Sequence, residues 1–130
     1  MKKAAIITLQ CTWGILQTLA GFAVLIFWAC RGKIYRPPEW VGHGFQTVAG
    51  DNWGGVSLGL FSFRDKASEN DINAVRHEDG HSVQSLILGL LYLPFVGIPS
   101  LINYHSKLSN SEYYKRYPEN WADNLGGVSR

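Results

Sequence analysis

Two long stretches without a charged side chain constrain this sequence more than any other feature. The first runs from Ala4 to Cys30 and the second from Ser82 to Tyr104. As a helix, the first stretch would be roughly 40 Å long, which exceeds the roughly 30 Å thickness of a bilayer's hydrocarbon core. We therefore expect residues 1–36 to form an N-terminal transmembrane helix and its flank. A cleaved signal peptide is the alternative, but the apolar run is longer than the hydrophobic region of such peptides.

The N-terminal half of the first stretch is less apolar than a simple membrane anchor. This half holds five polar side chains, namely Thr8, Gln10, Thr12, Gln17 and Thr18. We expect that half to pack on protein rather than on lipid. Basic residues lie at both ends of the stretch, so the charge distribution leaves the membrane orientation open.

The composition fits one membrane-associated domain. Hydrophobic residues make up 46% of the 130 residues and charged residues only 17%, against about 25% in an average soluble protein. The formal net charge of +2 predicts no particular partner, and there is no basic stripe suited to nucleic acid. We therefore expect an integral protein of a bacterial-type cell membrane, with the lipid bilayer as a partner and no nucleic acid. A homo-oligomer is compatible with this composition.

The remaining sequence predicts a mainly α fold with a short β element. Residues 31–40 are predicted to form a turn, because Pro37 and Pro38 bar a continuing helix. The glycine-rich segment that follows is predicted to be irregular. The VSLGLFSF run at 56–63 has strand composition, although its alternation slips at Phe61.

Three helical segments are predicted after this strand. The first opens near Ser68, which lies three residues before Asp71 in a weak capping box, and runs to the break at Pro94. The second covers SEYYKRY. The third has Pro118 in its first turn and is closed by Gly126-Gly127.

The second charge-free stretch directly follows the sequence His77-Glu78-Asp79-Gly80-His81, which fits the pattern H-E-x-x-H. On a helix, two histidines four residues apart project from one face and can bind a single zinc ion. Glu78 is offset from the metal, in a position to act as general base toward a water molecule. The pattern therefore predicts a zinc site with hydrolytic chemistry.

A catalytic zinc needs a third protein ligand and an open fourth position. One class of zinc peptidases takes this ligand from a histidine shortly after the motif, but Gln84 and Ile87 stand where Gly and His would be required. Another class takes a glutamate from a later helix, and Glu119 in ENWAD is the candidate. Asp123 lies four residues on, hence on the same helix face, and can fix the tautomer of a histidine ligand by accepting its hydrogen bond.

Together, RHEDGH and PENWADNLGG resemble the gluzincin zinc metallopeptidases, and Glu-x-x-Ala-Asp is similar to the motif of the membrane-embedded CAAX-prenyl-protease and HtpX-like branch. The resemblance implies His77, His81 and Glu119 as zinc ligands, Glu78 as general base and Asp123 as support for a ligand. It also implies an edge strand before the motif helix, along which an extended substrate lies, and the VSLGLFSF run is in that position. The chain is shorter than most members of the family and closer in size to minigluzincins.

The two motifs also constrain the path of the second charge-free stretch. A straight transmembrane helix over residues 82–104 would place Glu119 across the bilayer, about 30 Å from the histidines. Zinc bonds of about 2.0–2.2 Å do not allow this separation. We therefore expect a hairpin at about 82–104 that dips into the membrane and turns back near Pro94 and Pro99. Residues 37–130 would then form a minimal zincin-like catalytic domain.

A peptidase also needs a donor for the oxyanion that forms when water attacks a carbonyl. Phenol, imidazole and guanidinium groups can all donate such a hydrogen bond. The candidates precede Glu119 in the sequence and are His105, Tyr113, Tyr114 and Arg116.

These patterns predict a small membrane-anchored zinc metallopeptidase that hydrolyses bonds in a peptide or protein substrate. One alternative is a membrane protein with a structural zinc, in which His43 or His105 closes the fourth position and no turnover occurs. Another is a small helical membrane oligomer or pore without metal, which the polar residues along the first stretch suggest.

Overall fold

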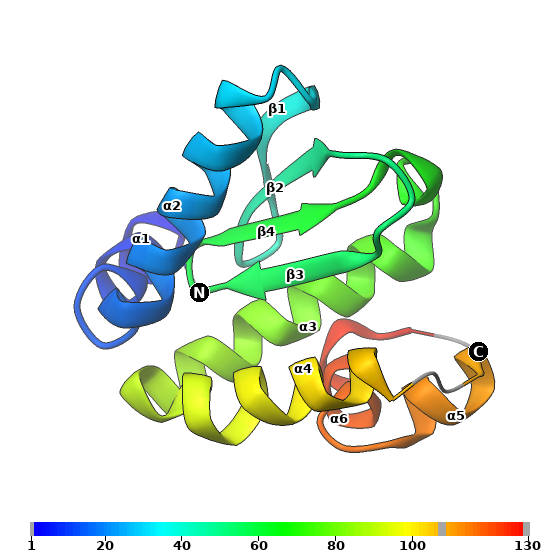
Figure 1. Cartoon of the computed structure of the whole chain (residues 1–130). Coiled ribbons are helices and arrows are strands. Elements are labelled where there is room, and N and C mark those ends of the chain that lie inside the picture. Colours follow the sequence, from blue (N-terminus) through cyan, green and yellow to red (C-terminus); the bar gives the residue numbers. More distant parts are fainter. Residues whose placement is uncertain (1, 107–108, 129–130) are drawn as a thin grey trace.

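A computed structural model of the chain, which describes residues 2–106 and 109–128, consists mainly of helices packed around one small sheet (Figure 1). The mainly α prediction is therefore confirmed, although the β part is larger than predicted. In chain order the elements are α1 (Lys3–Gln10), α2 (Ile15–Cys30), β1 (Ile34–Val41), β2 (Gly44–Ala49), β3 (Gly55–Leu58), β4 (Phe61–Arg64), η1 (Lys66–Ser68), α3 (Ile72–Leu88), η2 (Gly89–Leu91), η3 (Leu93–Gly97), α4 (Ile98–His105), α5 (Asn110–Lys115) and α6 (Glu119–Gly126).

The expectation of one continuous helix over Ala4–Cys30 is wrong. α1 ends at Gln10, α2 starts at Ile15, and the two helices are bent by 95°. They meet closely at Gly14, where an added Cβ atom would lie 2.6 Å from Oε1 of Gln10. Among the described residues, no helix by itself has the length and apolarity to cross a bilayer, and α1 and α2 meet that test only as a bent pair.

Polar side chains from the first charge-free stretch face α3. Gln10, Gln17 and Thr18 are buried, and the other two polar residues predicted to pack on protein are exposed. Oε1 of Gln10 accepts a hydrogen bond from the Ser85 hydroxyl at 2.7 Å, and Nε2 of Gln17 donates to the same hydroxyl at 2.9 Å. Nε2 of Gln10 also donates to the backbone oxygen of Ser82 at 3.3 Å. These buried hydrogen bonds attach α1 and α2 to the helix that carries the H-E-x-x-H pattern.

The sheet has the strand order β1-β2-β4-β3, in which β2 and β4 run parallel and the two outer pairs are antiparallel. The turn predicted at 31–40 is wrong, because β1 covers most of it. Pro37 and Pro38 are accommodated because β1 is an edge strand, and its pairing with β2 shifts register between Arg36 and Glu39. The segment predicted to be irregular contributes β2.

The VSLGLFSF run forms a hairpin rather than one strand. Gly59 and Leu60 connect β3 to β4, and Gly59 has a φ of +63°, which favours glycine. This turn explains why the alternation slips at Phe61. β3 lies at the edge of the sheet opposite β1, and α3 packs on β3 and β4.

α3 begins and ends at residues other than those predicted. Asp71 is the N-cap, its side chain accepting from the amide of Asn73 at 2.9 Å, and Ser68 belongs to η1. The helix ends at Leu88, and Gly89 follows with a φ of +56°. The chain therefore turns at Gly89 rather than near Pro94.

Residues 89–105, which comprise η2, η3 and α4, are called the return arm here. Figure 1 shows the arm running back from the end of α3 toward α6. The predicted helix at SEYYKRY is present as α5, and the last predicted helix is present as α6. Gly127 closes α6 in the left-handed conformation, as predicted.

Candidate metal centre

α3 and α6 approach each other so closely that only small residues fit between them. A Cβ atom added to Gly80 would lie 1.9 Å from the backbone oxygen of Ala122, and one added to Gly126 would lie 1.9 Å from that of Arg76. Ala122 is fully buried. The contact therefore explains why the middle of each motif carries a residue with little or no side chain. It places the first turn of α6 against the histidines of α3.

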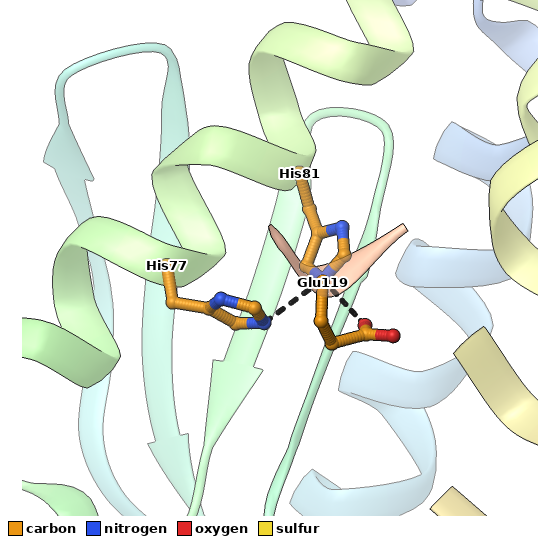
Figure 2. A group of neighbouring side chains, drawn as sticks. All are labelled: His77, His81 and Glu119. Carbon is orange, nitrogen blue, oxygen red and sulfur yellow. Dashed lines mark hydrogen bonds and ion pairs between the residues drawn. The ribbon is translucent and has the colours of Figure 1, made fainter. Parts of the chain in front are cut away.

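His77, His81 and Glu119 meet at one point, as Figure 2 shows. Nε2 of His81 lies 3.1 Å from Nε2 of His77 and 3.3 Å from Oε1 of Glu119. One ligand atom from each residue lies within 4.8 Å of the other two, and all three residues are buried. Tetrahedral bonds of about 2.0–2.1 Å would separate two ligand atoms by roughly 3.3–3.4 Å. The two separations given above are close to this value.

The tautomer of His77 is set by Asp123 on α6. Nδ1 of His77 lies 2.7 Å from Oδ1 of Asp123. An ionised carboxylate can only accept a hydrogen bond, so Nδ1 carries the proton. The Nε2 lone pair of His77 therefore faces His81.

Gln84 sets the tautomer of His81 in the same way. Nε2 of Gln84 donates to the backbone oxygen of Pro118 at 3.1 Å, which orients the amide. Oε1 of Gln84 then lies 2.7 Å from Nδ1 of His81 and must accept its proton. In the sequence, Gln84 served only to exclude a class of zinc peptidases and was given no role at the metal position. The sequence does hold a signal for this role, because Gln84 is a polar residue three positions after a ligand histidine.

Two imidazole lone pairs and one carboxylate oxygen thus point at the same buried position. Their mutual repulsion requires a cation there, either a proton or a metal ion. The pKa values reflect this. Burial alone would lower the pKa of His81, but the hydrogen bond to Glu119 and the charges of Glu78 and Glu119 outweigh it and raise that pKa. Burial would raise the pKa of Glu119, but its hydrogen bonds and the His81 charge lower it.

Two polar residues of the return arm hold the Glu119 carboxylate. The Ser100 hydroxyl donates to Oε1 at 2.6 Å, and Nδ2 of Asn103 donates to Oε2 at 3.0 Å. Glu119 itself is fully buried. Sequence reasoning missed both donors, although two polar residues three apart in an otherwise apolar segment place them on one helix face.

Glu78 lies between α3 and the edge strand. A Cβ atom added to Gly55 of β3 would lie 2.8 Å from Oε1 of Glu78. Oε2 is buried and has no hydrogen-bond partner among the described residues. Burial raises the pKa of Glu78, and the nearby His81 and His77 oppose that rise. A carboxyl group with a raised pKa and a free oxygen can take up a proton.

A cavity of about 540 Å³ opens beside these groups. Glu78 and His81 form part of its wall, together with β3 and the return arm. Most of the remaining wall is apolar and includes Val56, Leu58, Leu93, Ile98 and Leu101. The cavity can therefore receive an apolar group next to the metal position.

The four oxyanion candidates occupy different places. Tyr113 lines the cavity, whereas the Tyr114 ring lies edge-on to the His77 ring with centroids 5.1 Å apart. His105 and Arg116 are exposed and are not among the cavity residues. Of the four, the structure therefore brings only Tyr113 to the cavity.

The Tyr113 hydroxyl remains a donor. Burial raises the pKa of Tyr113, and the charges of Glu119 and Glu78 raise it further. The phenol is therefore protonated at neutral pH and can donate a hydrogen bond into the cavity.

His43 lies away from the metal position. Its backbone amide and Nδ1 both bond to Oδ1 of Asp79, at 2.8 and 3.1 Å. This pair joins α3 to the turn between β1 and β2. Neither His43 nor His105 belongs to the metal-binding group found among the described residues.

Comparisons with protein-family models, with curated proteins and with solved structures found no match to this chain.

Proposed function

We propose that the chain is a small zinc metallopeptidase of the gluzincin type. The observation that carries the proposal is the convergence of three lone pairs from His77, His81 and Glu119, with both histidine tautomers fixed from outside. Two nitrogen donors and one oxygen donor, two of whose separations are close to tetrahedral spacing, suit zinc with an open fourth position. When bound there, zinc supplies a Lewis acid that polarises a carbonyl and lowers the pKa of water.

The residues around the cavity can perform the remaining steps of peptide hydrolysis. In this proposal Glu78 accepts a proton from the attacking water and passes it to the leaving amine. Tyr113 then donates a hydrogen bond to the carbonyl oxygen as it becomes negative. A peptide in the cavity would lie against β3, an edge strand that can pair with an extended chain.

The open cavity favours an enzyme over a structural zinc site. A structural site is closed by a fourth protein ligand, and both histidines considered for that role lie elsewhere. A metal-free helical oligomer gives no reason for the three donor groups to converge beside a cavity. A purified protein with less than a trace amount of zinc would favour the metal-free oligomer.

The proposal is tested by measuring zinc content and hydrolysis of a peptide library in Glu78→Gln and Glu119→Ala variants. Glu78→Gln should retain one zinc per chain and lose about 10²–10⁴-fold in rate, the usual contribution of a general base. Glu119→Ala should lose zinc because a ligand is missing. Full activity of Glu78→Gln would remove Glu78 as the base, and equal zinc in Glu119→Ala would remove Glu119 as a ligand.

We also propose that the protein attaches to a lipid bilayer through one apolar surface. The surface combines exposed side chains of α2 with those of the end of α3 and the return arm. They are Leu16, Leu19, Phe22, Ile26 and Phe27, and Ile87, Leu90, Leu91, Phe95, Ile98, Leu101 and Ile102. The two groups adjoin where Trp13 contacts Gly89. Lys2 and Lys3 at the start of α1, and Arg31 after the end of α2, can bind anionic headgroups.

Flotation with vesicles containing anionic lipid tests this attachment. Ile102→Glu, within the apolar surface, should shift protein from the vesicle fraction to the soluble fraction, because a buried carboxylate is costly. Ile72→Glu is the matched control, since Ile72 is as exposed but starts α3, outside the surface. Equal flotation of both variants would contradict the proposal. The wild-type protein could instead be an oligomer that does not bind vesicles. If Ile102→Glu converts that oligomer to a monomer, the apolar surface is a contact between chains.

A further inference from the structure

The open edge of β3 has a defined set of outward-facing backbone groups. The two-residue turn makes Leu58 and Phe61 the closing pair of the hairpin, which exchanges both of its hydrogen bonds. Hydrogen-bonded pairs alternate along an antiparallel ladder, so Val56 also bonds to β4. The carbonyl and amide groups of Gly55 and Ser57 therefore point away from β4, toward the cavity side.

The same alternation continues into the loop before β3. The amide of Asp65 donates to the Gly54 oxygen at 2.9 Å, so Gly54 faces β4 and the Trp53 oxygen faces outward. The Tyr104 hydroxyl, from the end of the return arm, donates to that Trp53 oxygen. Tyr104 is 48% exposed. Water can replace this hydrogen bond without burying an unpaired group.

A second tyrosine of the return arm covers the other end of β3. The Tyr92 hydroxyl donates to the Ser57 oxygen at 2.7 Å. Tyr92 is only 2% exposed. Breaking this bond would leave a buried phenol and a buried carbonyl without partners, which is costly. Tyr92 is therefore a fixed part of the wall.

Gly55 lies between these two covered carbonyls. It is exposed, and it adjoins the Glu78 carboxylate. The outward carbonyl of Gly55 therefore lies between those of Trp53 and Ser57, and neither tyrosine hydroxyl bonds to it. A substrate backbone that pairs with Gly55 would be placed directly beside the general base.

We propose that Tyr92 and Tyr104 determine how a peptide lies along β3, which deepens the proposed function and rests on it. Because the Tyr92 hydroxyl bonds to the Ser57 carbonyl, a peptide cannot pair with β3 beyond this residue. Tyr104 is a gate at Trp53 that a longer peptide displaces. The substrate class is then an extended peptide that pairs at Gly55, continues toward Trp53, and places an apolar side chain in the cavity.

Tyr104→Phe tests the gate. Removing the hydroxyl frees the Trp53 carbonyl, so peptides long enough to reach it should gain one backbone hydrogen bond, worth roughly 2–10-fold in KM. kcat should stay unchanged, and peptides of about three residues should show no gain. Tyr35→Phe is the matched control, because its hydroxyl bonds to Asp51 on the surface at 2.7 Å, away from β3. Melting curves establish that each variant is folded.

Tyr92→Phe distinguishes the fixed wall from the gate. Its ring still fills the Ser57 end, so lengthening a peptide should bring no gain in KM. An equal gain in Tyr92→Phe and Tyr104→Phe, or no gain in Tyr104→Phe, would overturn the assignment.

A binding measurement separates this inference from the proposed function. In the zinc-loaded Glu78→Gln protein, calorimetry with an uncleaved peptide of about eight residues should show roughly 2–10-fold tighter binding when Tyr104→Phe is added. If wild-type protein binds zinc but cleaves no peptide, the peptidase function fails while this measurement still decides the gate. Unchanged affinity would remove the gate even if hydrolysis is established.

Discussion

At the scale of single residues, the candidate site depends on side chains that never touch the metal position. Asp123 and Gln84 each hold an Nδ1 proton, and thereby decide which nitrogen of each histidine is free to bind. Ser100 and Asn103 orient the Glu119 carboxylate by donating a hydrogen bond to each of its oxygens. Metal affinity should therefore respond to changes that leave all three ligands in place.

Asp123→Asn should lower zinc affinity by about 10–100-fold, the usual effect of losing a carboxylate that orients a histidine ligand. The neutral amide no longer stabilises the ligand histidine by charge. Competition with a chromogenic chelator measures the change. Asp79→Asn is the matched control, because Asp79 pairs with His43 in the turn between β1 and β2 and contacts neither ligand histidine through a hydrogen bond. Equal losses in the two variants would indicate a general effect on folding.

Prediction from sequence was strongest for residues whose chemistry depends on spacing. His77, His81, Glu119 and Asp123 were selected from two short motifs, and the structure places them together, although metal binding itself stays a prediction. Ser100 and Asn103 were missed because they lie inside an apolar stretch, where their partner comes from a distant helix.

At the scale of elements, the crossing of α3 and α6 at Gly80 positions the centre. Gly80→Ala adds a Cβ atom that would lie 1.9 Å from the Ala122 oxygen, so α6 must move. We expect a destabilisation of about 1–3 kcal/mol, as for other overpacked contacts, and weaker zinc binding although no ligand is changed.

Gly97→Ala is the control for Gly80→Ala. Its added Cβ atom would meet Leu93 at an ordinary 3.4 Å, so the gain in helix propensity, about 1 kcal/mol, should dominate. Thermal melting and zinc titration measure both variants. A stable Gly80→Ala protein with normal zinc affinity would show that the close crossing is not required.

Helices with clear end signals were the elements that the sequence predicted well. Pro118 and Gly127 bound α6 as expected. The bend between α1 and α2 was missed because an uncharged sequence indicates an apolar environment but does not indicate where the chain changes direction. β1 was missed because Pro37 and Pro38 argue against a strand unless it is known to lie at an edge, which depends on the order of all four strands.

At the scale of the whole molecule, the metal position links the beginning of α6 to the middle of α3. Without a metal ion, a proton must hold the three groups together. The raised pKa of His81 means that the folded state binds this proton more tightly than the unfolded state does. The proton therefore contributes stability below the ordinary pKa of 6.5 that is lost as the pH rises through the folded-state pKa.

Zinc should consequently stabilise the protein more at about pH 8 than at about pH 5.5, because zinc competes with this proton only where the proton is held. At a free zinc concentration about 1,000-fold above Kd, the gain approaches about 4 kcal/mol. Differential scanning calorimetry with and without a chelator measures it. Glu119→Ala should show little shift at either pH, and equal wild-type shifts at both would contradict the linkage.

α4 has different roles on opposite faces, since Ser100 and Asn103 point toward Glu119 while Ile102 points out. Inserting or deleting one residue just before this helix would rotate everything after it by about 100°. The apolar side of α4 would then face the Glu119 carboxylate, and Ser100 and Asn103 would face outward. The outer side of α4 can change its side chains while it stays apolar, but the number of residues that lead into the helix is fixed.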